Sequence, residues 1–227
     1  MPGRGVFVTG TDTEVGKTRV SLALMQSMQQ QGHRVLGMKP VAAGCELTSA
    51  GLVNEDALLL MRQSSIDCAY EYVNPYAFEP PIAPHIAAAQ VGEAIQLERI
   101  EQSYDALAEQ ADWVVVEGVG GWAVPLSDTT SVADIPRYLQ LPVVLVVGLR
   151  LGCINHALLS AAAIEQSGCR LLGWAGSAVD ADYLQVEATL ATLRERLPAA
   201  CLGVLGHQDR GTFSPEHSHL DVSFCLN

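Results

Sequence analysis

One stretch near the start of the chain, residues 6–18, constrains the fold more than any other. Its sequence is V-F-V-T-G-T-D-T-E-V-G-K-T, in which β-favouring residues run into Gly10 and a short polar turn follows. Gly16, Lys17 and Thr18 then open an amphipathic run that reaches about position 31. This order predicts a strand, a tight loop and the start of a helix.

A loop of this kind before a helix is typical of a phosphate site. Backbone N–H groups at the helix N-terminus point at the anion, and the helix dipole favours negative charge there. Gly16 lets the main chain approach closely, Lys17 can reach terminal phosphates, and the Thr18 hydroxyl can ligate Mg²⁺. The usual motif, G-x-x-x-x-G-K-[ST], needs glycine where this chain has Thr11, and the glycine stands one residue earlier. An ordinary strand-to-helix turn is the alternative, and we favour the phosphate site.

Length and composition fit one α/β domain spanning residues 1–227. Hydrophobic residues make up 49% of the chain and charged residues 17%, which is typical of a folded domain with a sizeable core. The formal net charge of −12 excludes broad nucleic-acid binding, which needs an extended basic face. Nucleotide binding needs only local positive charge, which Lys17 and Lys39, the two lysines, can supply.

We expect a cytoplasmic protein with no membrane partner, because the chain has no signal-peptide core and no apolar run of membrane-spanning length. The cysteines form no C-x-x-C pair, so we expect reduced, mostly buried thiols. The C-terminal histidines match no usual zinc spacing, and we interpret them as tail residues. They are His207, His217 and His219.

A second short strand is predicted just before Lys39. A lysine at the C-terminal end of a parallel strand lies where ligands bind in open sheets, although a solvated strand-end lysine is the alternative. Residues 41–53 are expected to form a mobile loop, and Asn54 to cap a helix over 55–63. Asp56 falls in the first turn of that helix, where the dipole favours negative charge.

The sequence W-V-V-V-E-G-V-G-G-W over residues 113–122 predicts another functional strand. Its unbroken valines fit a strand covered on both faces, as in a parallel sheet. We expect the strand to end in Glu117 and a glycine-rich turn to follow, with Gly118, Gly120 and Gly121. An acid in this place matches the Mg²⁺-organising acid of phosphate-loop proteins, and a strand-end acid facing water is the alternative.

Two further segments precede helices. Residues 71–86 hold four prolines, which predicts an ordered loop, and we interpret His85 as a capping residue. Residues 152–155, G-C-I-N, lead into a helix whose N-terminus can receive a carboxylate or phosphate, although Asn155 can also be just a cap.

The repeated order of strand, helix and strand predicts the fold class. Further strands are expected over 143–148, 171–179 and 202–205, with a helix over 182–196. Such repeats produce a parallel sheet with right-handed crossovers. The sequence therefore predicts an α/β protein with a doubly wound, mostly parallel sheet and helices on both faces.

Several separated motifs resemble the dethiobiotin synthetase family, in the family's own order. They are G-T-D-T-E-V-G-K-T at 10–18, K-P-V-A at 39–42, N-P-Y-A-F at 74–78, P-H-I at 84–86, V-E-G-V-G-G-W at 116–122, P-L-S-D at 125–128 and L-G-C-I-N-H-A at 151–157. The longer phosphate loop is itself the family's pattern. Several motifs in order are much harder to obtain by chance than one glycine-rich loop.

The resemblance implies a P-loop NTPase fold and an ATP-dependent cyclo-ligase of biotin synthesis. The family converts 7,8-diaminononanoate, CO₂ and ATP to dethiobiotin, ADP and phosphate, through a carbamate and a carbamic–phosphoric mixed anhydride. It also implies Mg²⁺ and a homodimer whose active sites lie at the interface.

The resemblance further implies roles for individual residues. Lys17 would neutralise the β and γ phosphates, Lys39 would stabilise the carbamate and the transferring phosphoryl group, and Thr13 would donate to either. Glu14 would point away from the phosphates, toward a substrate amine or a metal-bound water. Mg²⁺ would be held by Thr18, Asp56 and Glu117. The other ATP contacts would be Val15, Gly16, Gly118, Gly120, Gly121 and Ser177, and the other substrate contacts Ala43 and the partner-derived Gly152, Cys153, Ile154 and Asn155.

Three places depart from the family's pattern. Ala43 stands where the family often has serine or threonine, so a hydroxyl near the carbamate is missing. Ser177 stands where close relatives have the asparagine that reads adenine, and the segment 206–211 lacks the family's proline-containing turn. We therefore expect intact catalysis and looser base recognition.

Another class of protein also fits the phosphate loop, namely a P-loop ATPase switch of the partition or metal-insertion type. Such switches usually carry an additional lysine near the start of the loop, which residues 10–12, G-T-D, lack. A related amidoligase of cobalamin synthesis needs a glutamine-hydrolysing domain that does not fit in 227 residues. The ligase is the leading hypothesis.

Overall fold

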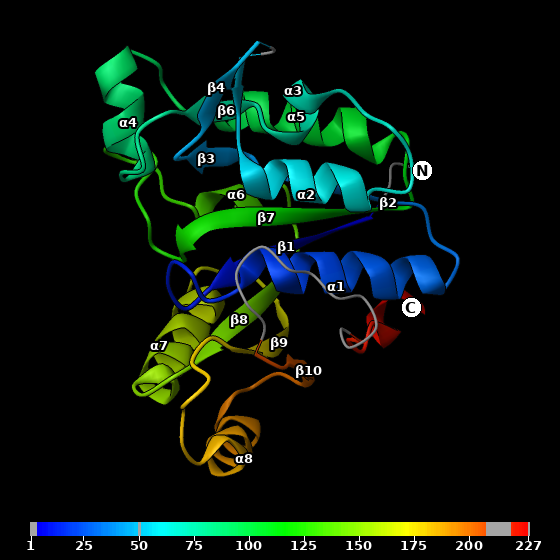
Figure 1. The fold of residues 1–227 in the computed structure, drawn as a ribbon, viewed down its shortest axis with the longest axis vertical. Coiled ribbons are helices and arrows are strands. Elements are labelled where there is room, and N and C mark those ends of the chain that lie inside the picture. The colour runs from blue at the N-terminus through cyan, green and yellow to red at the C-terminus, as the bar shows by residue number, and fades with distance from the viewer. Residues whose placement is uncertain (1–3, 50, 208–218, 227) are drawn as a thin grey trace.

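Six parallel strands form the central sheet (Figure 1). The computed structural model describes residues 4–49, 51–207 and 219–226. Across the sheet the strand order is β10 (Cys201–Leu205), β9 (Leu171–Ala178), β8 (Val143–Leu149), β1 (Arg4–Gly10), β7 (Trp113–Gly121) and β2 (Val35–Met38). All neighbouring pairs in it are parallel, so the predicted doubly wound, mostly parallel sheet is confirmed.

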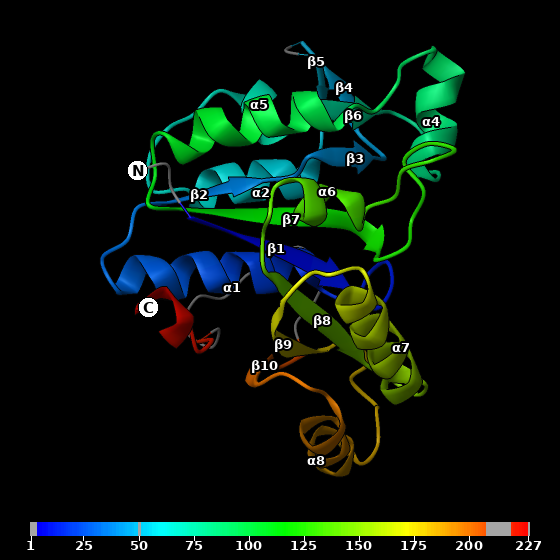
Figure 2. The same cartoon turned by 180° about the vertical axis from the view of Figure 1, so that it is seen from behind.

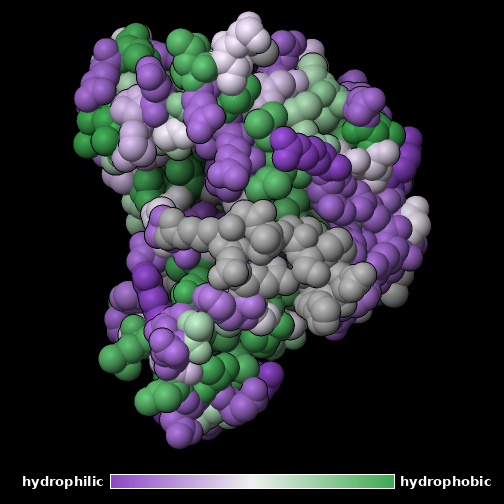
Figure 3. Space-filling model, viewed as in Figure 1, coloured by the Kyte–Doolittle hydropathy of each residue, from purple (hydrophilic) through white to green (hydrophobic). Residues whose placement is uncertain are grey.

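Helices cover both faces of this sheet, as Figure 1 and, from behind, Figure 2 show. One face carries α1 (Lys17–Gln30) and α2 (Glu55–Gln63), and the other carries α5 (Leu97–Ala108), α6 (Asp134–Tyr138), α7 (Cys153–Gln166) and α8 (Val186–Arg196). The strands β7 and β8 are rich in valine because both of their faces are buried. The helices need only one apolar side, and hydrophilic residues gather over the C-terminal halves of α1 and α2 in Figure 3.

The winding of the chain reverses beside β1, and this determines where a ligand can bind. From β1 the chain runs to β2 at one edge of the sheet, and it later passes through β7 to β8, β9 and β10 on the other side of β1. At the carboxyl end of β1, Gly10 lies opposite Gly121 of β7 and Val146 of β8. Open α/β sheets bind ligands at such a switch point, outside the carboxyl ends of the strands.

The predicted loops over residues 41–53 and 71–86 are wrong. Instead, β3 (Val41–Ala43) pairs in parallel with β6 (Tyr76–Phe78), and β4 (Glu46–Thr48) forms an antiparallel hairpin with β5 (Gly51–Val53). Two short helices, α3 (Tyr70–Val73) and α4 (Pro84–Val91), complete this region. Strands of three residues have too little periodicity to be recognised, and the partner of β3 lies far along the chain.

The start of α2 agrees with the sequence prediction, and the starts of α4 and α7 do not. Asn54 caps α2, its side chain accepting a hydrogen bond of 3.2 Å from a backbone N–H of the first turn. His85 is not a cap, because α4 begins at Pro84, whose fixed φ and missing N–H suit the first helical position. Asn155 is not a cap either, because α7 begins at Cys153 after a left-handed Gly152 with φ 93°.

The C-terminal residues 219–226 pack onto α1 and the sheet and end in a 3₁₀ helix, η2 (Ser223–Leu226). Leu220 is buried between α1 and the sheet, and a backbone hydrogen bond of 2.7 Å ties this segment to β10. The Phe224 ring meets Trp113 edge-on, with ring centroids 5.9 Å apart. The segment therefore completes the hydrophobic cluster on the α1 side.

Three further expectations concern the whole chain. The six cysteines (Cys45, Cys68, Cys153, Cys169, Cys201 and Cys225) are free, and four of them are buried. Over the described residues, no helix combines the length and the apolar character needed to cross a membrane. The predictions for His217 and for most of the segment 206–211 fall on residues 208–218, outside the described residues.

Replacing Leu220 by alanine should lower the free energy of unfolding by about 2–5 kcal/mol, because this side chain is buried against α1 and the sheet. Leu184→Ala is the matched control, since Leu184 is 80% exposed and should stay within about 0.5 kcal/mol of wild type. Urea denaturation followed by circular dichroism measures both. Equal stability of Leu220→Ala and wild type would contradict the docking of the C-terminal segment.

Candidate active site

A cavity of about 650 Å³ opens at the carboxyl edge of the sheet. Its walls come from the phosphate loop, the starts of α1 and α2, the ends of β2 and β7, and the segment after β9. Elements far apart in the sequence meet here because the parallel strands end at the same edge. A volume of roughly 300–1,000 Å³ is typical of small-molecule sites.

The phosphate loop presents its main chain to this cavity. Gly16 has φ 87°, and a Cβ at this position would collide with the Ser177 hydroxyl of β9 beneath it. Val15 points its buried side chain at Gly148 of β8, where a larger residue has no room. Because α1 begins at Lys17, its first backbone N–H groups lack helical acceptors. The loop thus offers backbone donors at a helix N-terminus, as an anion site requires.

Lys17 is buried beside this loop without a carboxylate in contact. Its Nζ donates to the Asp12 carbonyl at 2.9 Å. The Asp12 side chain is itself paired with Arg150, with 2.5 Å between Oδ2 and the guanidinium nitrogen. Burial, and then the charge of Lys39, lower the pKa of Lys17 to about 8. An ammonium group in this environment gains from an incoming anion such as a polyphosphate.

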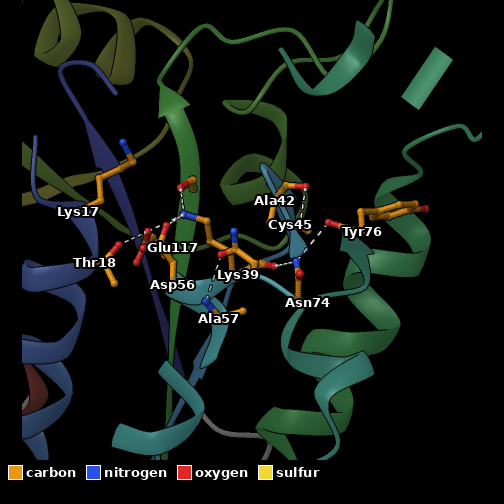
Figure 4. Close-up of polar contacts among 12 residues, drawn as sticks. Lys17, Thr18, Lys39, Ala42, Cys45, Asp56, Ala57, Asn74, Tyr76 and Glu117 are labelled. Atoms are coloured by element: carbon orange, nitrogen blue, oxygen red, sulfur yellow. Dashed lines mark hydrogen bonds and ion pairs between the residues drawn. The ribbon is translucent and has the colours of Figure 1, made fainter. Parts of the chain in front are cut away.

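Lys39 lies at the centre of a second group of charges (Figure 4). Its Nζ is 2.6 Å from Glu117 Oε1 and 3.1 Å from Asp56 Oδ2. The Gly118 carbonyl accepts from the same Nζ at 3.3 Å, and the Thr18 hydroxyl donates to Glu117 Oε1 at 3.0 Å. These contacts join the ends of β2 and β7 to the first turns of α1 and α2.

Burial and charge act in opposite directions on this group. The side chain of Lys39 is 5% exposed and that of Glu117 is 0% exposed. Burial alone would lower the pKa of Lys39, but the Glu117 and Asp56 carboxylates raise it above its ordinary value. Burial would raise the pKa of Asp56, but the Lys39 charge brings it below its ordinary value. At neutral pH, Lys39 is therefore an ammonium and Asp56 a carboxylate.

Asn74 fixes the backbone from which Lys39 projects. The buried Asn74 amide donates to the Lys39 carbonyl at 2.7 Å and to the Tyr76 carbonyl at 3.1 Å. The Lys39 N–H donates to the Val73 carbonyl at 2.7 Å. The N-P-Y-A-F motif thus holds the lysine in place from a distant part of the sequence.

The oxygens of Thr18, Asp56 and Glu117 suit Mg²⁺, a hard cation that prefers oxygen ligands. The second carboxylate oxygen of Glu117, Oε2, is buried and has no hydrogen-bond partner among the residues that the structure describes. An unpartnered buried oxygen fits a cation that the protein itself does not supply. The described residues contain no metal-ligating group of three His, Cys, Asp or Glu side chains. Nucleotide oxygens and water would therefore complete a Mg²⁺ shell.

The structure brings most of the predicted site residues together around the cavity. Those that line it are Thr13, Glu14, Gly16, Lys17, Thr18, Lys39, Ala43, Asp56, Glu117 and Gly120. Thr13 and Glu14 are exposed, and the backbone of Glu14 is left-handed, with φ 59°. A non-glycine residue in this conformation is uncommon, and here it directly precedes Val15 and Gly16 of the phosphate loop.

Other predicted residues do not line the cavity. Gly118 and Gly121 are strand residues, because β7 continues past Glu117 to Gly121. The turn expected directly after Glu117 is therefore wrong, since pairing with β1 extends the strand. Ser177 is fully buried beneath Gly16, and within the described part of the chain its hydroxyl has no hydrogen-bond partner.

The predicted segment 152–155 lies at the start of α7, away from the cavity wall of its own chain. Cys153 is buried against the core, Ile154 is half-buried, and Gly152 and Asn155 are exposed. The N-terminus of α7 is thus accessible to another molecule.

Sequence reasoning missed the far wall of the cavity. It is lined by Arg19 and Leu22 of α1, by Ala178 at the end of β9 with Val179 after it, and by His207 after β10. Arg19 donates to the Gly206 carbonyl at 2.6 Å, and His207 Nδ1 lies 3.3 Å from the Ala178 carbonyl. The interpretation of His207 as a tail residue is wrong, because the pairing of β10 with β9 brings it to the cavity.

Comparison with known proteins adds independent evidence on the family to which this chain is similar. A family model described as an AAA domain matches residues 4–211. The ATP-dependent dethiobiotin synthetase BioD of Pseudomonas aeruginosa strain LESB58 is 50% identical over 217 residues, which cover 95% of each chain. The protein of the same name from Cellvibrio japonicus is 46% identical over 227 residues, 100% of each chain. That from Xanthomonas oryzae pv. oryzae strain PXO99A is 54% identical over 197 residues, 87% of this chain and 88% of the relative.

Solved structures support the fold alone. A ParA family ATPase from Chlorobium tepidum superposes with a TM-score of 0.57 at 11% identity and covers 99% of both chains. The MinD cell division protein of Aquifex aeolicus gives 0.55 at 13% identity, with 92% of this chain and 84% of that chain covered. The predicted P-loop NTPase fold is confirmed.

Proposed function

The chain belongs to the family of ATP-dependent dethiobiotin synthetases, and on this premise we propose that it closes the ureido ring of dethiobiotin. Membership makes it an ATP-dependent ligase that forms carbon–nitrogen bonds. The proposed substrates are 7,8-diaminononanoate, CO₂ and ATP, and the products are dethiobiotin, ADP and phosphate. We place this activity in one domain spanning residues 1–227, in the cytoplasm.

The observation that carries this proposal is the presence of two buried lysines in one cavity. A phosphate loop with Lys17 is sufficient to bind a nucleotide. A ligase also needs a positive group for a second anionic reactant. Lys39, beside the acid pair of Asp56 and Glu117, supports this second role.

The proposed reaction has three steps, namely carbamate formation, phosphoryl transfer and ring closure. They need no reactant besides diaminononanoate, CO₂ and ATP. One amine of the substrate attacks CO₂ and loses a proton, which forms a carbamate. A carbamate oxygen attacks the γ-phosphorus, the bond to the bridging oxygen breaks, and ADP leaves a mixed anhydride behind. The second amine attacks the carbamoyl carbon and loses a proton, the bond to the phosphate oxygen breaks, and the ring closes.

The proposed roles of the side chains follow from where negative charge develops. Lys17 neutralises the β and γ phosphates, and Lys39 stabilises the carbamate and the transferring phosphoryl group. Charges fixed in advance against such a transition state contribute most to phosphoryl transfer. Thr13 donates to phosphate or carbamate, and Glu14 receives a substrate amine. The Ala43 methyl group leaves the carbamate without a neighbouring hydroxyl.

The remaining contacts to ATP come mainly from the main chain. The backbone of Val15 and Gly16 cradles the phosphates. Gly120 of β7 lines the cavity and keeps that wall free of a side chain, whereas Gly118 and Gly121 would not contact ATP. Thr18, Asp56 and Glu117 would hold Mg²⁺, which when bound would supply charge stabilisation at the phosphates.

We propose a homodimer in which each site is completed by the partner subunit. The exposed start of α7, with Gly152, Cys153, Ile154 and Asn155, does not line its own cavity. A helix N-terminus favours an anion, so this segment of one subunit would bind the substrate carboxylate in the site of the other.

A product assay tests the proposed function directly. Diaminononanoate, bicarbonate, Mg²⁺ and ATP should give dethiobiotin, detected by mass spectrometry, with one ADP per ring closed. ATP hydrolysis that does not depend on diaminononanoate, without dethiobiotin, would instead indicate an ATPase switch of the partition or metal-insertion type.

Lys17→Ala and Glu117→Gln should each lower kcat by about a hundredfold or more. The first removes a positive charge aimed at the phosphoryl group, and the second removes a carboxylate that would hold Mg²⁺ there. Glutamine is preferred at position 117 because alanine would leave the buried Lys39 without its closest partner. Arg196→Ala, an exposed cation on α8, is the control and should retain wild-type kcat. Near-wild-type turnover in either site variant would exclude this assignment.

Hybrid dimers test whether the sites are shared. Lys17→Ala and Asn155→Asp should each be inactive alone, and their mixture should recover about a quarter of wild-type activity, since half of the dimers are hybrid and each hybrid has one intact site. Subunit exchange is checked by native mass spectrometry. No recovery after confirmed exchange would show that each site lies within one chain.

Base selectivity tests the loss of the adenine-reading amide. The buried Ser177 hydroxyl cannot make the bidentate amide contact that discriminates bases by about 1–3 kcal/mol, and the phosphate cradle ignores the base. GTP, CTP or UTP should therefore support dethiobiotin formation within about tenfold of ATP in kcat/KM. A preference for ATP of about a hundredfold or more would show that other groups, such as the backbone near Ala178 and Gly206, read adenine.

A further inference from the structure

Lys39 occupies the position between two carboxylates that a divalent cation would take. Its ammonium group contacts Glu117 Oε1 at 2.6 Å and Asp56 Oδ2 at 3.1 Å. A cation of the chain itself thus already balances one of the two negative charges of the proposed metal ligands. Without this ammonium, the fully buried Glu117 would be an unpaired negative charge beside the carboxylate of Asp56, which a protein interior tolerates poorly.

Hydrogen bonds hold the Lys39 main chain in place, whereas its side chain borders the cavity. Hydrogen bonds of 2.7 Å from the Asn74 amide and to the Val73 carbonyl fix the main chain on both sides of the residue. Lys39 itself lines the cavity, so its side chain borders the space in which the reactants would bind.

We propose that Lys39 acts as an internal counter-ion that excludes divalent cations from Asp56 and Glu117 until a nucleotide is bound. This inference rests on the metal ligands assigned under the proposed function. The nucleotide phosphates bring the negative charge that lets the acid pair hold a divalent cation, and the displaced ammonium then faces the second reactant. Metal entry and the placement of Lys39 against the carbamate are thereby coupled.

The unpartnered Glu117 oxygen supports this exchange. Oε1 already accepts from Lys39 and from the Thr18 hydroxyl, whereas the buried Oε2 has no hydrogen-bond partner over residues 4–49, 51–207 and 219–226. A carboxylate that bound only the lysine in every state would leave this oxygen unsatisfied throughout, which native structures rarely allow.

Binding of Mn²⁺ to the nucleotide-free protein tests the proposal without any turnover. Electron paramagnetic resonance of free Mn²⁺ gives the Kd for wild type and for Lys39→Gln, whose amide can still donate to Glu117. We expect binding about tenfold or more tighter in Lys39→Gln, because a competing positive charge is removed from the acid pair. The gain should disappear in the double variant Lys39→Gln/Glu117→Gln.

Lys17→Gln is the matched control, since it removes the same charge from the same cavity. The Lys17 ammonium is hydrogen-bonded to the Asp12 carbonyl and not to the acid pair. A gain equal to that of Lys39→Gln would overturn the proposal, because it would reflect net charge alone. An unchanged Kd in Lys39→Gln would overturn it as well. These outcomes are separate from the product assay, which decides the ligase function.

A second measurement uses the wild-type chain and does not depend on the folding of a variant. The Kd of Mn²⁺ for the protein is compared with the Kd for its complex with ADP, after subtraction of binding to free ADP. We expect the Kd of Mn²⁺ to be lower by about tenfold or more for the ADP complex than for the nucleotide-free protein. Equal affinities would overturn the proposal.

Discussion

The structure depends on the pairing of a buried lysine with buried acid at the carboxyl edge of the sheet. An isolated charge in this position would be costly, so Lys39 and Glu117 require one another, and their 2.6 Å contact joins β2 to β7. Asp56 extends the pair to α2, and the Thr18 hydroxyl extends it to the phosphate loop at the start of α1. One electrostatic requirement thus aligns four elements around the cavity.

The two lysines of the chain serve the site in different ways because their surroundings differ. Lys17 donates a hydrogen bond to a carbonyl, and burial lowers its pKa. Its positive charge is therefore poorly compensated until phosphates bind. Lys39 is surrounded by carboxylates that raise its pKa, so it remains charged and is available in exchange for another cation. In our proposal, this division assigns the nucleotide to one lysine and the carbamate to the other.

Much of the fold and of the candidate site was predictable from local sequence. The features that were not predictable depend on contacts between distant segments. The phosphate loop, the capping by Asn54 and the valine-rich strands follow from nearby residues, and the structure has them as predicted. The pairing of β3 with β6, the place of His207 and the burial of Ser177 depend on which strands are neighbours in the sheet. Strand order is set by tertiary packing, which periodicity along one segment does not report.

The fate of the oxygen atoms of CO₂ distinguishes a mixed-anhydride intermediate from other routes to the ureido ring. If the carbamate attacks the γ-phosphorus and its oxygen leaves with the phosphate on ring closure, one oxygen of CO₂ ends in inorganic phosphate. Single-turnover reactions with C¹⁸O₂, quenched before exchange with water, should give phosphate that carries one ¹⁸O atom, seen as an isotope shift in ³¹P NMR. Dethiobiotin accompanied by unlabelled phosphate would contradict the mixed-anhydride mechanism and the role assigned to Lys39.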